Sequence, residues 1–277
     1  DKFLPEFSLF HNVKWMEDII ISQCPCKKSS YLSSHSSHPI PTNEISSYLL
    51  KDLSKGMLYT DFIDKFFIQS QSSYASYNKF EYPKYKIIKV KPFVWGYKKP
   101  HYKNLNRTKV KLLHASTFKL RAFRPFIYEN SNLYFLKLNK LCELISQTSK
   151  LELIIRPCVN KEFELDNYDK MLTYYNYKNI SLSIKKSFID DINTSDLLLS
   201  FSSTTIEESI YLNKKVILLS SPDEHKHFSN NNLVDEMDII NISSKNFEDK
   251  VLSFLNLEFK HDYHKYDYDI KNLFNEK

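Results

Sequence analysis

The chain has 277 residues, of which only two, Gly56 and Gly96, are glycine, whereas average usage of about 7% would give roughly 19. A Walker A loop or a GxGxxG fingerprint needs at least two glycines within six to eight residues, so the sequence excludes both. A phosphate bound by this chain is therefore expected at a helix start lined by serine and threonine.

The charge of the chain is modestly basic, with 39 Lys+Arg, 33 Asp+Glu and a formal net charge of +6. The lysines are spread along the sequence, which argues against a nucleic-acid partner and allows a weak peripheral attraction to anionic membranes or substrates. The sequence has no apolar run long enough for a membrane span and no signal-peptide pattern at its start. Four cysteines without a disulfide-like pattern fit a reducing compartment. The expected location is cytoplasmic, including the inner face of the cell membrane. The chain begins with Asp1, which suggests a fragment or a trimmed chain.

The first hundred residues show little regular pattern. A stretch rich in Ser, Pro and His, 24–43, predicts a loop, and apolar residues at helical spacing over 45–67 predict an interrupted helix. Residues 85–94 read as a strand, and the basic, proline-containing stretch 98–109 reads as a linker. The predicted domains are a partial N-terminal α/β domain with its linker, 1–104, and a C-terminal α/β domain, 105–277.

From residue 109 onward, short apolar segments alternate with segments of helical periodicity. This pattern predicts a doubly wound, parallel, Rossmann-like α/β domain whose ligand lies beyond the carboxyl ends of the strands. The predicted strands are 110–114, 151–155, 180–184, 197–200, 216–219 and 239–242, and the predicted helices are 133–146, 166–175, 202–212 and 247–257.

The most informative segment runs from Asp196 to Leu219. A strand leads into a cluster of hydroxyl side chains, and two glutamates, Glu207 and Glu208, follow in the first turns of a helix. Hydroxyls and free backbone N–H groups at such a helix start favour a phosphate or pyrophosphate. The alternative is plain N-capping, because Ser or Thr followed by Glu is the pattern of a capping box.

Basic residues follow two other predicted strands. Residues 112–117 end in small polar side chains and lead to Lys119, Arg121 and Arg124, while Arg156 ends the strand 151–155. Cations at these positions can bind a phosphate or a carboxylate. The alternatives are a solvated basic loop for the first group and a pairing with a neighbouring acid for Arg156.

Histidine and cysteine clusters suggest metal binding only weakly. His225 and His227 lie beside Asp223 and Glu224 in a segment that is read as a surface loop or as a ligand contact. Cys24 and Cys26 are too close for an ordinary zinc pair, and His35 and His38 nearby are not framed by short elements. No metal and no cofactor are expected. Cys142 and Cys158 are predicted to be small core residues.

The segment 196–219 resembles the donor-binding segment of GT-B glycosyltransferases. It is also similar to UDP-N-acetylglucosamine 2-epimerases and to CDP-glycerol glycerophosphotransferases, which share that fold. Tyr211 to Ile217 follow the pattern of those families, with Asn213 in the place of Gly and Lys215 in the place of Pro. The element "IRPC" at Ile155–Cys158 is similar to an "iRpH" element of transferases of capsule and surface polysaccharides.

The resemblance implies a GT-B-like fold with a reduced or truncated N-terminal domain, and a metal-independent enzyme of polysaccharide biosynthesis. This enzyme would transfer a sugar from a UDP-, CDP- or CMP-linked donor to a glycan or lipid-linked acceptor. The resemblance assigns donor phosphates to Ser202, Ser203, Thr204, Thr205, Arg156, Lys119 and Arg121, and ribose or sugar to Glu208, Glu207, His114, Thr117 and His225.

No catalytic residue is assigned, and His11, Asp18, His35 and His38 are the candidates for a base. The alternatives within the fold are a glycerophosphotransferase and a 2-epimerase. The alternative from another class is a non-catalytic nucleotide-binding or scaffold protein.

Overall fold

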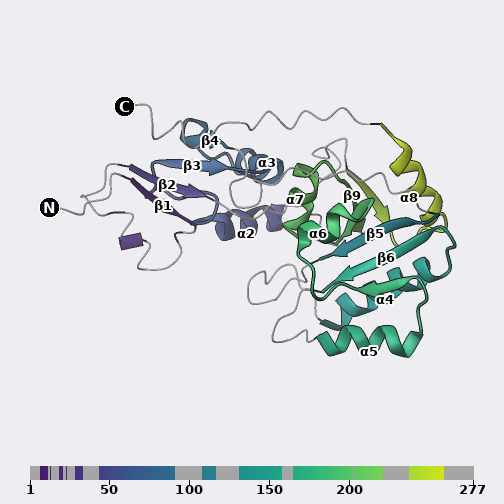
Figure 1. The fold of residues 1–277 in the computed structure, drawn as a ribbon. Helices are drawn as coiled ribbons and strands as arrows, with labels where there is room; N and C mark the ends of the chain where they lie inside the picture. Colours follow the sequence, from purple (N-terminus) through teal and green to yellow (C-terminus); the bar gives the residue numbers. More distant parts are fainter. Residues whose placement is uncertain are drawn as a thin grey trace. The chain divides into compact units, whose positions relative to one another are not determined.

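The computed structural model describes residues 7–11, 13, 19–20, 23, 29–33, 44–90, 108–116, 131–157, 165–201, 203–220 and 237–258. These residues fall into two compact units, an N-terminal one and a C-terminal one (Figure 1). Each unit has its own sheet, and every strand pairing in both sheets is parallel. The fold is α/β, as the alternation of segments predicts.

The N-terminal unit contains a four-stranded sheet in the order β1-β2-β3-β4. Its core is aromatic, with Phe66, Phe67 and Tyr77 almost fully buried and Tyr59 stacked on Tyr82 at 4.5 Å between ring centroids. Its elements are β1 (Phe7–Phe10), β2 (Ser29–Ser33), α2 (Glu44–Ser54), β3 (Lys65–Ile68), α3 (Gln71–Lys79), η1 (Lys84–Lys86) and β4 (Ile87–Lys89).

Two sequence predictions for this unit are wrong. Strand β2 lies inside the predicted loop 24–43, and the predicted helix 45–67 ends at Ser54 and is followed by β3. In β2, Ser30 and Ser33 are buried at positions where a strand normally has apolar side chains. Asp64 accepts hydrogen bonds from both the backbone N–H and the Oγ of Ser30 at 2.7 Å. Hydrogen bonding thus replaces the apolar pattern on which the prediction of a strand depends.

The C-terminal unit contains a six-stranded sheet in the order β10-β9-β8-β5-β6-β7. Counted from β5, this is the order 3-2-1-4-5-6 of the Rossmann fold, with the reversal between β5 and β8. The elements are β5 (Val110–Ala115), α4 (Ser131–Ser146), β6 (Leu151–Arg156), α5 (Leu165–Tyr175), β7 (Ile180–Leu182), α6 (Phe188–Asn193), β8 (Leu197–Ser200), α7 (Thr205–Tyr211), β9 (Lys215–Ser220), β10 (Met237–Asn241) and α8 (Phe247–Asn256).

Helices lie on both faces of this sheet (Figure 1). Helices α4, α5 and α8 pack on one face in a cluster that includes Leu112, Leu153 and Leu199. The alternate residues of the strands, such as Leu113 and Leu198, are equally buried outside that cluster, as are apolar residues of α6 and α7. Burial on both faces explains why these strands are continuously apolar in the sequence.

At the end of α7, an asparagine adopts the conformation that glycine usually has after a helix. Asn213 has φ 57, the left-handed conformation that glycine usually adopts after a helix. The N–H groups of Lys214 and Asn213 donate to the carbonyls of Ser209 and Ile210, both at 2.9 Å, which is a Schellman motif. Asparagine tolerates this conformation better than other residues with a β-carbon, so it replaces the glycine of the related pattern.

Lys215 stands where the related pattern has proline, and it has a structural function. Its Nζ donates to the carbonyls of Phe254 at 3.0 Å and Leu257 at 2.6 Å, and also to the carbonyl of Leu255. The last carbonyls of a helix have no intrahelical donor, and a cation at a helix C-terminus is favourable. The carbonyl of Phe254 also accepts from the N–H of Leu257 at 3.3 Å. Lys215 therefore joins β9 to the end of α8.

Candidate functional site

The reversal of strand order between β5 and β8 brings two serine hydroxyls together. The Oγ atoms of Ser116 and Ser200 are 3.1 Å apart, and Ser200 Oγ donates to the carbonyl of Ala115 at 2.6 Å. The backbone N–H of Phe201 donates to Ser116 Oγ at 2.6 Å. These bonds join the carboxyl ends of the two strands, where an open α/β sheet binds its ligand. The sequence contains both serines, but only the topology shows that they meet.

The predicted hydroxyl cluster lies at the start of α7. Thr204 is the N-cap residue, with helical dihedral angles and no hydrogen bond from its side chain to the helix N–H groups. Ser203 Oγ accepts from the N–H of Thr205 at 3.3 Å, and Thr205 Oγ1 donates to the carbonyl of Ala115 at 3.3 Å. The capping-box alternative is therefore wrong for Thr204. Helix α7 has only 7 residues, so few peptide dipoles are aligned behind this end.

Of the two glutamates, Glu208 faces the open side of α7. Glu207 is 5% exposed and, like Ile206 and Ser209, belongs to the buried face of the helix. Glu208 is half-buried, and burial raises the pKa of its carboxyl to about 7, against the opposing effect of the Arg156 guanidinium. Within the part of the chain that the structure describes, its carboxyl has no hydrogen-bond partner. A desolvated carboxyl beside a cation at the end of a sheet is typical of a ligand-binding or catalytic position.

Arg156 ends β6 and is held by α6 and the segment before it. Its Nη1 donates to Asp191 Oδ2 at 3.0 Å and to the carbonyl of Lys186 at 2.6 Å. Asp191 is fully buried and also accepts from Ser183 Oγ at 2.8 Å. The alternative that Arg156 pairs with a neighbouring acid is thus confirmed. Its side chain remains 30% exposed, so the ion pair leaves part of Arg156 in contact with solvent.

His114 was predicted to contact a sugar, and in the structure it is fully buried. Its ring packs edge-on against Phe201 at 5.3 Å, and its Nε2 lies 3.5 Å from the hydroxyl of Tyr134. Burial lowers the pKa of this imidazole to about 4, so the ring is neutral at physiological pH. This geometry corrects the prediction, because the side chain belongs to the core and presents no surface to a sugar.

The remaining candidates lie mostly outside the described residues. His11 is described and is exposed. Cys142 is fully buried and free, which confirms its prediction as a core residue. The candidates outside the described residues are Asp18, Cys24, Cys26, His35, His38, Thr117, Lys119, Arg121, Arg124, Cys158, Ser202, Asp223, Glu224, His225 and His227.

Sequence reasoning missed Asp191, the buried partner of Arg156. The segment Ser187–Asp191 could have indicated it. Ser187 and Asp190 form a capping box at the start of α6, and Asp191, the next residue, is buried. Among the described residues, no group of His, Cys, Asp and Glu has the arrangement of a metal site. No helix in those parts of the chain is long and apolar enough to cross a membrane.

Comparison with known proteins shows which solved structures have a similar fold. No family model and no curated protein matches the sequence, but solved structures match its fold. A structure of S. aureus MnaA with UDP has a TM-score of 0.57 at 13% identity, covering 94% of this chain and 67% of that one. For a putative UDP-N-acetylglucosamine 2-epimerase from Listeria monocytogenes the TM-score is 0.54 at 14% identity, with 91% and 65% covered.

A lipopolysaccharide outer core galactosyltransferase, WaaB, matches with a TM-score of 0.51 at 13% identity, covering 99% of this chain and 75% of that one. The fold is GT-B-like. The predicted fold class is thereby confirmed, and the parallel sheets of the two units are those of Rossmann-like domains. The chain spans about two thirds of the length of the two structures with the higher TM-scores.

Proposed function

We propose that this chain binds a nucleotide-sugar donor at the carboxyl ends of β5 and β8 and transfers its sugar to a glycan or lipid-linked acceptor. The observation that carries the proposal is Glu208, a half-buried carboxyl without a hydrogen-bond partner in the described structure, near Arg156. The position is the reversal of a Rossmann-type sheet, where nucleotides bind. Proteins with the same fold support it, since one is named as a galactosyltransferase and another was solved with UDP.

In the proposed complex, Glu208 accepts hydrogen bonds from the ribose hydroxyls, because an ionised carboxylate offers two acceptor oxygens. Thr204, whose hydroxyl makes no cap bond, lies one turn before it on the same face of the helix and contacts a donor phosphate. The exposed part of Arg156 neutralises the charge that develops on the leaving diphosphate. Lys119, Arg121 and Ser202 are proposed to assist there, and Thr117 and His225 to contact the sugar. The domain division at residue 104 also remains a proposal.

A direct test measures the binding of UDP, CDP and CMP by titration calorimetry to the full chain and to Glu208→Ala. One nucleotide should bind, and the substitution should weaken it about 10- to 100-fold, because a hydrogen bond to a charged group contributes about 1.5–3 kcal/mol. Glu258→Ala, at an exposed glutamate of the C-terminal unit, is the matched control and should leave binding unchanged. Binding of no nucleotide, or equal binding by Glu208→Ala, would contradict the proposal.

The second candidate function is a 2-epimerase, which is favoured by the structural match to the Listeria protein. Incubation with UDP-N-acetylglucosamine separates the two. A transferase consumes the donor only when an acceptor is present, whereas an epimerase changes the sugar without an acceptor. Binding without either reaction would favour the non-catalytic alternative.

A further inference from the structure

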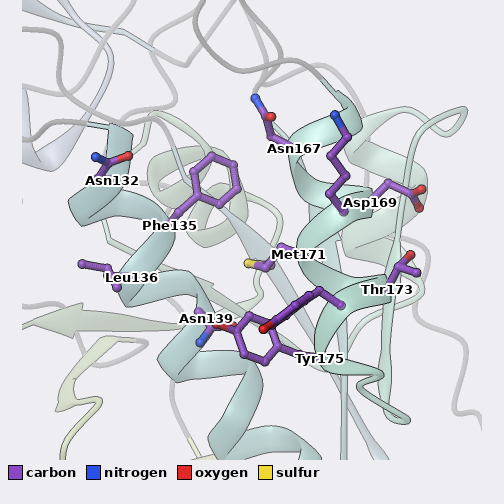
Figure 2. A pocket seen from close by; sticks show the side chains of 11 residues that line it. Asn132, Phe135, Leu136, Asn139, Asn167, Asp169, Met171, Thr173 and Tyr175 are labelled. Atoms are coloured by element: carbon purple, nitrogen blue, oxygen red, sulfur yellow. The ribbon is translucent and has the colours of Figure 1, made fainter.

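A groove of about 990 Å³ lies between helices α4 and α5 of the C-terminal unit (Figure 2). Its α4 side is formed by Asn132, Phe135, Leu136 and Asn139, which follow the i, i+3, i+4, i+7 spacing of one helix face. Its size is at the upper end of the roughly 300–1,000 Å³ that is usual for ligand sites. None of the described residues that line it belongs to the proposed donor site.

Large apolar groups remain uncovered in this groove. Leu136 is 65% exposed, Tyr174 82% and Tyr175 48%. Phe135 and Met171 point toward each other across the space between the helices (Figure 2). A contiguous uncovered apolar surface on neighbouring helices is a mark of a binding site, unlike apolar residues that are exposed singly.

Neutral polar side chains are interspersed with these apolar groups. The amides of Asn132 and Asn167 and the hydroxyl of Thr173 line the groove, and each can both donate and accept hydrogen bonds. Among the lining residues that the structure describes, the charged ones are Asp169 and Lys170, which have opposite signs. The described part of the lining therefore has no net formal charge, although the whole chain has a net charge of +6.

Contacts between side chains already hold one end of the groove in place. Tyr175 stacks on Tyr177 at 5.5 Å with only 15° between the ring planes. The hydroxyl of Tyr177 donates to Asn139 Oδ1 at 2.8 Å, and Asn139 Nδ2 donates to Glu143 at 3.1 Å. The rings of Phe135 and Tyr168 also pack together at 5.1 Å. A ligand would lose little free energy in ordering these groups, since they are pre-organised.

We propose that this groove binds a neutral oligosaccharide. Sugar rings have an apolar C–H face that packs on aromatic rings and a rim of hydroxyls that bond to amides, and both chemistries alternate in this lining. An anionic lipid surface would require clustered lysines and arginines instead, and the described lining of the groove has one lysine. The inference rests on the proposed function in one respect: the groove would hold the glycan acceptor or product apart from the donor site.

The test titrates the full chain with maltohexaose, cellohexaose and chitohexaose, using calorimetry or NMR shifts. At least one should bind, and Tyr174→Ala and Asn167→Ala should each weaken it about tenfold or more. Tyr174→Phe, which keeps the ring, should retain binding. Tyr48→Ala is the matched control, because Tyr48 is a similarly exposed tyrosine, at 77%, in the N-terminal unit. Circular dichroism should show unchanged folding for all variants, since the altered side chains are exposed.

Several results would overturn this inference. They are no binding of the three glycans at millimolar concentration, binding that the groove variants leave unchanged, and binding only of dextran sulfate in a salt-dependent manner. Displacement of the glycan by anionic vesicles would likewise favour a membrane surface. UDP binding without glycan binding would refute the groove and leave the donor site standing. Glycan binding without nucleotide binding would support the groove and refute the donor site.

Discussion

At the scale of single residues, Glu208 combines the features of a ligand-binding group. It has a position near a cation, partial burial and no hydrogen-bond partner among the described residues. The neighbouring Glu207 has the same chemistry in the sequence but lies on the buried face of α7. The helical geometry of α7 therefore decides which of two adjacent glutamates is available to a ligand.

Titration of Glu208 gives a pH-dependent prediction. Its pKa in the folded chain is about 7, above the ordinary value of 4.5. Folding therefore favours the protonated form, and the stability that this carboxyl contributes is fully present below about pH 4.5 and is lost as the pH rises through about 7. We expect Glu208→Gln, which cannot ionise, to gain stability relative to the wild type between pH 5 and pH 8.

The expected gain is on the order of 1–3 kcal/mol, discounted for the partial exposure of the side chain. Urea denaturation of both proteins at a series of pH values measures it. Comparison at each pH cancels the contributions of the other titrating groups. A stability difference that stays constant from pH 5 to pH 8 would show that Glu208 has an ordinary pKa in the fold.

At the scale of elements, the pair of Arg156 and Asp191 connects the end of β6 to α6. Asp191 is fully buried and Arg156 is partly exposed. Removal of the guanidinium would leave a buried carboxylate without its counter-charge. We expect Arg156→Met to destabilise the fold by about 3 kcal/mol or more, because breaking a buried pair costs about 3–5 kcal/mol.

Lys111 and Glu152 offer the matched control for this prediction. They form an ion pair of 3.4 Å on the same sheet with both side chains partly exposed. Such a pair contributes about 0–1 kcal/mol, so Lys111→Met should have little effect on the urea midpoint. Equal effects of the two substitutions would mean that the link between β6 and α6 is no stronger than a surface ion pair.

The hydroxyls at the ends of β5 and β8 show how an element boundary is built without glycine. Ser116 and Ser200 bond to each other, and Ser200 and Thr205 both donate to the carbonyl of Ala115. Several hydroxyls of this segment are therefore occupied within the protein. Among the described hydroxyls that were predicted to bind phosphate, Ser203 and Thr205 make hydrogen bonds within the protein, whereas Thr204 makes no cap bond. Thr204 therefore stays the candidate hydroxyl for a phosphate.

At the scale of the whole molecule, hydrogen exchange can show which of the two units binds the nucleotide. If the donor binds at the reversal of the larger sheet, UDP should slow hydrogen exchange of backbone amides in residues 112–116 and 197–211, because the ligand stabilises these segments locally. Residues 44–90 of the N-terminal unit serve as the internal control. Mass spectrometry of the chain with and without UDP measures both. Protection confined to residues 44–90 would place the nucleotide on the other sheet.

Much of the C-terminal unit could be predicted from its sequence. The apolar segments at 110–114, 151–155 and 197–200 correspond closely to β5, β6 and β8, and the helix predicted at 133–146 corresponds to α4. The central positions of these strands are buried on both faces and are mostly apolar, so each segment stands out against its neighbours. The start of α7 was also found, because serine and threonine cluster before its two glutamates.

Other features depended on contacts between residues far apart in the chain. Strand β2 has two buried serines whose partners are distant in the sequence: Ser30 bonds to Asp64, 34 residues away, and Ser33 accepts from Gln69, 36 residues away. Its own sequence therefore does not indicate a strand. The same holds at the candidate site, where Ser116 meets Ser200 across 84 residues. Local sequence reports the spacing of apolar side chains, and it thereby determined the alternation of strands and helices. Only the tertiary structure decided which polar groups bond within the protein and which, like Glu208, have no hydrogen-bond partner among the described residues.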